Sequence, residues 1–189
     1  MIRILPNSPG YTWGSTLEER SATYPCDRYL PEADDVLFRA LTVQRNKSEV
    51  FKWLCQLRVA PYSYDWIDNR GQLSPRKLIP GLDNLTAGER FMEIFELLEF
   101  APDEHITLHM DRAGANRIFG DIVISYVLRS ASPSATRLLV KLLARRTTYR
   151  PFAWVGPLLP WGDFIMMRKQ LLNLKGLCES SARGESISD

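Results

Sequence analysis

The stretch His105-Ile106-Thr107-Leu108-His109-Met110-Asp111 decides the class of fold. Apolar side chains stand at every second position, and polar side chains stand between them. Because successive side chains of a β-strand point to opposite faces, this pattern predicts a strand with one face in a core. The segments 118–129 and 138–144 alternate in the same way, with short turns between them. The sequence therefore predicts half-buried antiparallel strands joined by hairpins. Further strands are expected at 36–44 and at 91–100, the latter with a bulge.

A long helix is predicted near the end of the chain, from about Trp161 to Ser181. Its apolar stripe advances by three and four residues in turn and consists of Phe164, Met167, Leu171, Leu174 and Cys178. A shorter helix is predicted after Asn46, whose side chain can cap it, with Glu49 at the third helical position. The apolar stripe of this second helix is Val50, Trp53, Leu54 and Leu57.

The order of these elements predicts an α+β helix-grip fold. A curved antiparallel sheet would wrap its apolar face around the long C-terminal helix and leave an internal cavity between them. The irregular connection 58–89 would close one mouth of that cavity. Residues 1–34 are expected to form an N-terminal arm packed on a domain of residues 35–181, followed by a polar tail of residues 182–189. Leu139 and Leu143 fall on the outward face of their strand, so the arm or a second subunit is expected to cover them.

The segment Tyr62-Ser63-Tyr64-Asp65-Trp66-Ile67-Asp68-Asn69 lies in the long connection. It combines large aromatic side chains with carboxylates, which an ordinary core element would not bury without partners. One interpretation is a pocket wall, part packed and part facing a cavity. The other is structural: the aromatics pack the loop onto the sheet, and the aspartates cap a short helix.

The composition excludes several classes of partner. The net charge of +2 over 189 residues is small and the basic residues are scattered, so the overall charge indicates neither a nucleic-acid partner nor an anionic membrane. The longest apolar runs, 122–128 and 152–161, are too short to span a bilayer, so no membrane insertion is expected. No signal-like N-terminal segment occurs, and the cysteines are odd in number with spacings that match no zinc or redox motif, which favours a reduced, cytoplasmic location.

The sequence also lacks the usual motifs of metal and cofactor sites. His105 and His109 would lie about 13 Å apart on a strand, too far to share one ion, so no metal site is expected. Neither a nucleotide-binding glycine motif nor a G-x-S-x-G sequence occurs, and no cofactor is expected.

The chain resembles the SRPBCC superfamily, whose members have the START-like, polyketide cyclase/dehydrase-type helix-grip fold. The resemblance covers about residues 13–180 and points to a bacterial branch with a YSYDW-DN segment. It rests on Trp13-Gly14-Ser15-Thr16, the run from Arg39 to Leu57, the segment 62–69 and Asp163-Phe164-Ile165-Met166-Met167-Arg168. It implies a deep, largely apolar cavity that holds a lipid, sterol, polyketide or similar molecule, and in some members cyclisation or dehydration. No catalytic signature of the superfamily can be carried over to residues of this chain.

Three functional hypotheses follow. The first is a module that binds a hydrophobic small molecule, as a monomer or a homodimer. Its expected ligand-binding residues are Tyr62, Tyr64, Trp66, Asp68, Asn69, Ile122, Ile124, Tyr126, Leu138, Val140, Phe164 and Met167. The second is a cyclase- or dehydratase-type enzyme in which Tyr64 and Asp65 move protons. The third is an interaction protein whose interior is filled by its own side chains.

Overall fold

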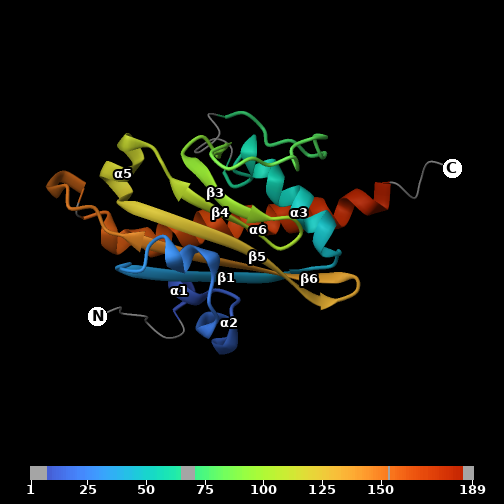
Figure 1. Cartoon of the computed structure of the whole chain (residues 1–189), viewed down its shortest axis with the longest axis horizontal. Helices are drawn as coiled ribbons and strands as arrows, with labels where there is room; N and C mark the ends of the chain where they lie inside the picture. Colours follow the sequence, from blue (N-terminus) through green and yellow to red (C-terminus); the bar gives the residue numbers. More distant parts are fainter. Residues whose placement is uncertain (1–7, 65–70, 153, 185–189) are drawn as a thin grey trace.

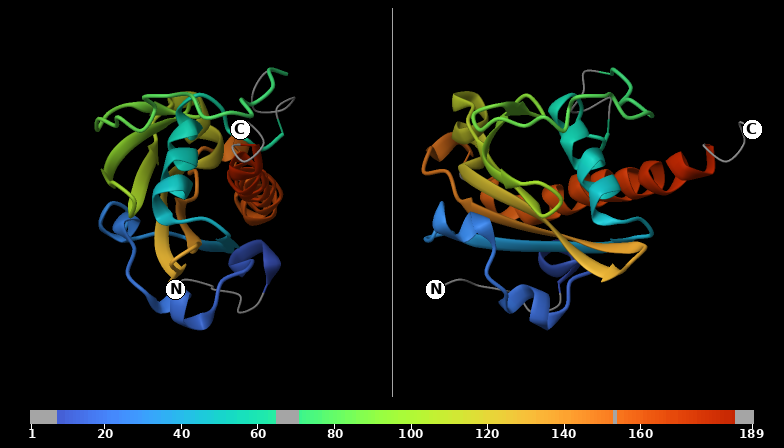
Figure 2. Two further views of the ribbon diagram at one scale, coloured as in Figure 1. Left: turned by 90° about the vertical axis from the view of Figure 1, so that its right-hand side faces the viewer. Right: turned by 45° about the vertical axis from the view of Figure 1, so that its right-hand side comes forward.

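The computed structural model describes residues 8–64, 71–152 and 154–184. Within these ranges, six antiparallel strands form one sheet in the order β1-β6-β5-β4-β3-β2. The strands are β1 (Asp35–Val43), β2 (Arg90–Phe91), β3 (Phe95–Ala101), β4 (His105–Met110), β5 (Asp121–Ser132) and β6 (Ala135–Arg145). The sheet curves around the long C-terminal helix α6 (Leu159–Gly184), as Figures 1 and 2 show. The α+β helix-grip class predicted from the sequence is confirmed.

The remaining helices are short. In the arm they are α1 (Pro9–Thr12), α2 (Leu17–Ser21) and the 3-10 turn η1 (Pro25–Arg28). Beyond the arm they are α3 (Lys47–Cys55), η2 (Gln56–Arg58), α5 (Ala113–Phe119), η3 (Arg150–Phe152) and η4 (Gly156–Leu158). Helix α3 begins where predicted, because the Asn46 side chain accepts a hydrogen bond of 3.0 Å from the backbone N–H of Glu49.

Two predicted elements differ from the structure. The short turn expected between the strands at 105–111 and 118–129 is replaced by helix α5, which ends at Phe119 before Gly120, where φ is +84°, so the second strand begins at Asp121. The strand expected at 91–100 is divided into β2 and β3, because Met92 and Glu93 adopt left-handed conformations with φ of 48° and 60°. The bulge expected in this segment is present between Leu97 and Glu99.

The concave face of the sheet carries the main core. Alternate residues of β4, β5 and β6 point toward α6 and α3, so the period-two pattern of the sequence becomes one apolar layer. Trp53 and Leu54 of α3 are buried in this layer together with Leu171 and Leu174 of α6. The main core therefore joins the sheet, α3 and α6.

The convex face is covered by the arm. Leu139 and Leu143 are buried in a second cluster with Tyr24, Cys26 and Leu30 of the arm. Polar groups beneath the arm also have partners, since the backbone N–H of Cys26 donates to Ser125 Oγ at 2.8 Å. The arm thus supplies the cover that the two outward leucines required.

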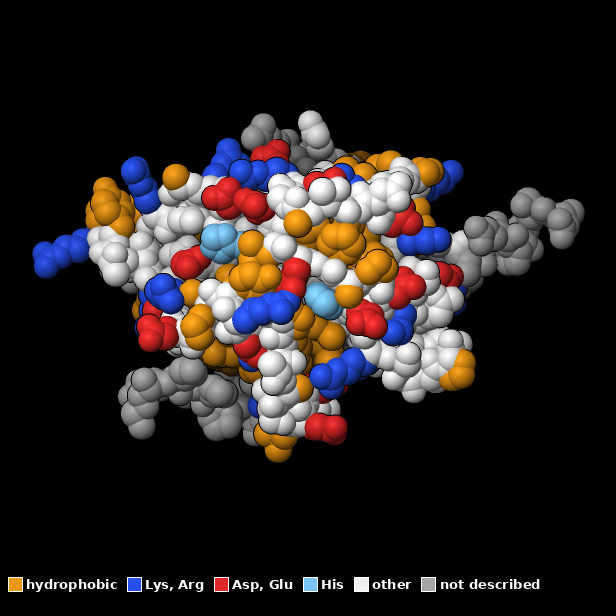
Figure 3. Space-filling view, viewed as in Figure 1, with side chains coloured by type: hydrophobic (Ala, Val, Ile, Leu, Met, Phe, Trp, Pro, Cys, Tyr) orange, Lys and Arg blue, Asp and Glu red, His pale blue; other side chains and the backbone are white. Residues whose placement is uncertain are grey.

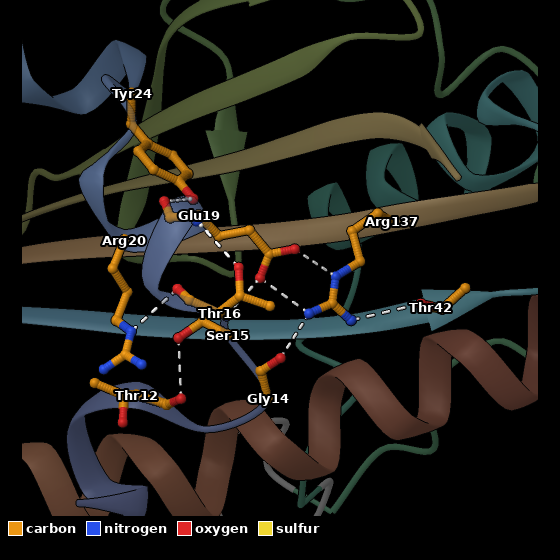
Figure 4. Close-up of polar contacts among 9 residues, drawn as sticks. All are labelled: Thr12, Gly14, Ser15, Thr16, Glu19, Arg20, Tyr24, Thr42 and Arg137. Atoms are coloured by element: carbon orange, nitrogen blue, oxygen red, sulfur yellow. Dashed lines mark hydrogen bonds and ion pairs between the residues drawn. The ribbon is translucent and has the colours of Figure 1, made fainter. Parts of the chain in front are cut away.

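A charged contact attaches the arm to β6. Arg137 donates to both carboxylate oxygens of Glu19, at 2.7 and 3.0 Å, and to the carbonyl oxygen of Gly14 (Figure 4). Gly14 has φ of +73°, and a Cβ at this position would overlap the carbonyl oxygen of Ala40 on β1. The close approach of arm and strand therefore requires glycine.

Candidate functional site

A pocket of about 590 Å³ lies between the concave face of the sheet and the first half of α6. Its wall is mostly apolar and consists of Pro61, Ser63, Met92, Glu93, Ile94, Phe95, Met110, Phe119, Ile122, Ile124, Tyr126, Leu142, Val155, Leu158, Leu159, Gly162, Asp163, Met166, Met167 and Gln170. The right-hand view of Figure 2 shows the layers that enclose it. The pocket occupies the position expected for the cavity of this fold.

Local periodicity explains which side chains form the two main walls. Ile122, Ile124 and Tyr126 stand at alternate positions of β5, so all three face α6. On α6 the lining residues recur at spacings of three and four, from Leu159 to Gln170, which places them on one side of the helix.

A buried polar chain crosses the pocket wall. The Tyr126 hydroxyl donates to Gln170 Oε1 at 2.8 Å, and Gln170 Nε2 donates to the carbonyl oxygen of Pro61 at 2.7 Å. Burial raises the pKa of Tyr126, so the phenol remains protonated and acts as a hydrogen-bond donor. These two hydrogen bonds link β5 and the backbone at Pro61 to α6.

A buried ion pair forms another polar part of the wall. Asp163 Oδ2 lies 2.7 Å from Arg39 Nη2, and the side chains are exposed to 10% and 1%. Arg39 also donates to the carbonyl oxygens of Phe38 and Gly10, both at 2.8 Å. Burial raises the pKa of the Asp163 carboxyl above its ordinary value, although the charge of Arg39 acts in the opposite direction. The pocket therefore contains a desolvated carboxyl group.

The structure separates the apolar residues that the sequence grouped together. Ile122, Ile124, Tyr126 and Met167 line the pocket. Leu138 and Val140 are buried in the core instead, and Leu138 packs near Trp53 in the part of the interface filled by α3. Phe164 lies on another side of α6, with its ring centroid 6.3 Å from those of Trp13 and Trp161.

The aromatic-acidic segment is described only in part. Tyr62 is buried, its ring is 6.2 Å from that of Trp53, and its carbonyl oxygen accepts a hydrogen bond from Asn173 of α6. Ser63 lines the pocket, and Tyr64 is half-buried outside the described lining. The other predicted residues of the segment lie outside the described residues: Asp65, Trp66, Asp68 and Asn69.

Sequence reasoning did not identify Arg39, Asp163 or Gln170 as site residues. A signal for two of them was present. Arg39 interrupts an otherwise apolar strand, and Gln170 falls within the apolar face of the long helix. Such polar residues at core positions need partners, and here the partners lie at the pocket wall.

Other chemistries find no support in the described part of the chain. No group of three or more His, Cys, Asp or Glu side chains there could hold a metal ion. His109 lies 2.7 Å from Asp121 in a partly exposed pair. Burial raises the pKa of the Cys26 thiol to about 11 and those of Cys55 and Cys178 to about 12, which disfavours reactive thiolates.

Comparison with known proteins identifies the fold. No protein-family model matches the sequence, and no curated protein sequence is significantly similar to it. Solved structures do match. The protein MLL2253 from Mesorhizobium loti has a TM-score of 0.50 at 14% identity, over 77% of this chain and 97% of that one. The hypothetical protein jhp0584 from Helicobacter pylori has a TM-score of 0.52 at 12% identity, over 82% and 95%.

A START superfamily protein from Mycobacterium smegmatis also matches, with a TM-score of 0.46 at 15% identity over 81% of this chain and 99% of that one. These similarities concern the fold alone.

Proposed function

We propose that this protein binds a hydrophobic small molecule, such as a lipid, a polyketide or a similar metabolite, between the sheet and α6. The observation that carries the proposal is the pocket of about 590 Å³ with its mostly apolar wall. Pockets for small ligands commonly measure about 300–1,000 Å³ and combine an apolar lining with a few polar groups. Burial of apolar ligand surface contributes about 25 cal/mol per Å², so a ligand of modest size gains several kcal/mol.

The polar groups of the wall suggest how the ligand is oriented. Tyr126 and Gln170 already form hydrogen bonds with each other and with the Pro61 carbonyl, so they have little hydrogen-bonding capacity left for a ligand. Asp163 borders the pocket, and one of its carboxylate oxygens accepts a hydrogen bond from Arg39. A ligand with an apolar body and one hydrogen-bond donor, such as a hydroxyl group, suits this wall best.

Two glycines of α6 provide a matched test. Gly162 lines the pocket and Gly176 lies further along α6, outside it, and a Cβ at either position would meet no atom within 4 Å. A Cβ therefore has room at both positions, and we expect the indole of Gly162→Trp to occupy part of the pocket, with Gly176→Trp as its control. Binding of the uncharged fluorescent probe N-phenyl-1-naphthylamine would be titrated with each protein.

We expect Gly162→Trp to weaken probe binding by about tenfold or more, equivalent to about 1.4 kcal/mol, and Gly176→Trp to leave it unchanged. Native mass spectrometry of the purified protein would then show whether a co-purified ligand is lost from Gly162→Trp alone. Equal probe binding by all three proteins, or no binding by the wild type, would contradict the proposal.

A catalytic function of the cyclase or dehydratase type is the second candidate. It is favoured by the position of Asp163, whose carboxyl group borders the pocket and is desolvated, so that burial raises its pKa above the ordinary value. Tyr64 and Asp65 remain candidates from the sequence. The test is turnover of the co-purified ligand or its precursor by Asp163→Asn, Tyr64→Phe and Asp65→Asn. If all three retain full turnover, none of these residues is catalytic.

The third hypothesis, an interior filled by side chains, has less support. It required a packed space between sheet and helix, and a pocket of about 590 Å³ occupies part of that space.

A further inference from the structure

One end of the molecule, where the pocket reaches the surface, exposes large apolar side chains. We call this group the apolar end and define it as Phe119, Tyr149, Trp154 and Leu158, which are exposed to 37%, 51%, 64% and 56%. Phe119 and Leu158 also line the pocket. The exposed apolar surface is therefore continuous with the apolar interior.

Local contacts hold the apolar end in place. The Thr147 hydroxyl donates to the carbonyl oxygen of Arg117 at 2.8 Å, which joins the segment after β6 to α5. The Trp154 indole N–H donates to the carbonyl oxygen of Pro151 at 3.0 Å. The polar edge of the indole is thus satisfied within the chain, and its ring remains exposed.

Basic side chains accompany these rings. Arg117 and Arg150 are exposed, and neither forms an ion pair with the described residues. In contrast, Arg146 is held by Asp35 at 2.8 Å, and Arg112 lies 3.7 Å from Glu93. Figure 3 shows hydrophobic and basic side chains together at the left-hand end of the molecule, where Figure 1 places α5 and the segment after β6. The two free guanidinium groups are therefore available to bind phosphate.

We propose that the apolar end docks on the surface of an anionic lipid bilayer, so that the pocket exchanges its ligand with the membrane. The inference rests on the proposed function, in which the pocket holds an apolar ligand. Such a ligand would otherwise have to pass through water between the membrane and the pocket. Tryptophan and tyrosine favour the interfacial region of bilayers, and arginine binds lipid phosphates. None of the described helices is both long and apolar enough to cross a membrane, so the contact is peripheral.

The shape of this end favours a bilayer over a protein partner. It projects from one extremity of the long axis of the molecule (Figure 1). A stable protein interface buries about 800 Å² on each partner, which a narrow projection supplies less readily than a flat face. A bilayer surface is fluid and adapts to inserted aromatic rings, so the apolar end can bind it without shape complementarity.

The test is co-sedimentation with vesicles of phosphatidylcholine, alone or mixed with phosphatidylglycerol. We expect the wild type to bind the mixed vesicles more tightly and to lose this preference at high salt. Arg117→Glu with Arg150→Glu should weaken binding to the mixed vesicles by about tenfold or more. The control is Arg76→Glu with Lys77→Glu, an equal charge change on exposed residues of the segment at the upper right of Figure 1.

The apolar contribution needs its own variants. Tyr149→Ser with Trp154→Ser should weaken binding to both kinds of vesicle by about tenfold or more. The matched control is Leu17→Ser with Leu73→Ser, since these leucines are exposed to 75% and 85% elsewhere on the surface.

Neither Tyr149 nor Trp154 lines the pocket, so their variant should bind N-phenyl-1-naphthylamine like the wild type. This result separates the two proposals: failure of vesicle binding with intact probe binding overturns only the membrane proposal. The membrane proposal is also overturned if the wild type does not sediment with mixed vesicles, or if the variants and their controls bind equally. Capture of a protein partner by this end, without vesicle binding, would contradict it as well.

Discussion

The two halves of the interface between the sheet and α6 contain similar apolar side chains but differ in packing. Around Trp53, Leu54 and Leu174 the free volume is about 10 Å³, whereas the pocket beside Ile124 and Met167 measures about 590 Å³. The filled half contains α3, which contacts β5, β6 and α6. No helix takes this position at the open half in the described part of the chain; α5 and residues 155–159 only border it. The pocket therefore depends on where one helix lies, and apolar composition alone does not create it.

The boundary between the halves is made of polar contacts. Gln170 of α6 donates to the Pro61 carbonyl, and Asn173, one turn later, donates to the Tyr62 carbonyl at 2.9 Å. Tyr62 has a left-handed φ of 56° and packs against Trp53. The corner at residues 61–62 thus separates the packed half from the pocket.

Truncation of a large side chain in each half should give unequal losses. We expect Trp53→Ala to lower the free energy of unfolding by about 3–5 kcal/mol, because the truncation removes contacts in a closely packed region and leaves a cavity there. Met167→Ala should cost about 2 kcal/mol, since Met167 already borders a cavity and loses fewer contacts. Urea denaturation of both variants measures the difference, and equal losses would show that the open half is packed in solution.

Removal of one partner from the buried ion pair should also be costly. Asp163→Asn leaves the Arg39 guanidinium buried without its carboxylate, and we expect a loss of about 3 kcal/mol. Replacement of both partners, by Arg39→Met with Asp163→Leu, should restore most of the stability because no buried charge remains. Chemical denaturation of the single and double variants is the measurement. A double variant less stable than Asp163→Asn would mean that other groups depend on the pair.

On the convex face, we expect a smaller, pH-dependent effect on the free energy of unfolding. It should not alter either half of the interface between the sheet and α6. Burial opposes ionisation of Glu19, but hydrogen bonds from Arg137 and Thr16 outweigh it and hold the pKa of Glu19 below its ordinary value. The stabilisation is therefore complete above the unfolded pKa near 4.5 and disappears as pH falls through the lower folded value.

Glu19→Gln should accordingly cost about 1–2 kcal/mol at neutral pH and progressively less below pH 4.5. Denaturation of wild type and variant across this pH range is the measurement, with N-phenyl-1-naphthylamine binding at neutral pH as the control. A difference that does not change with pH would contradict the assigned role of the carboxylate, and altered probe binding would show that the two faces are coupled.

The sequence was a good guide to the sheet and the long helix, because alternation and helical spacing are properties of neighbouring residues. It was a poorer guide where tertiary contacts decide. Phe164 belongs to the same apolar stripe as Met167, yet it packs against Trp13 of the arm. Arg39 stands in an apolar strand, and only the fold brings Asp163 beside it, 124 residues later. The segment 62–69 attracted attention by composition, but its described part contributes Ser63 to the pocket, and Tyr62 packs against α3.

The pattern of apolar residues is enough to predict that a curved antiparallel sheet packs on a C-terminal helix, since a half-buried strand and an amphipathic helix must bury their apolar faces together. It also indicated that the outward leucines of β6 need a cover. The folded structure is needed to show that the arm is that cover, that α3 fills one half of the interface, and that the other half is left open beside a buried carboxyl group. These outcomes depend on the relative positions of elements distant along the chain, which local periodicity does not encode.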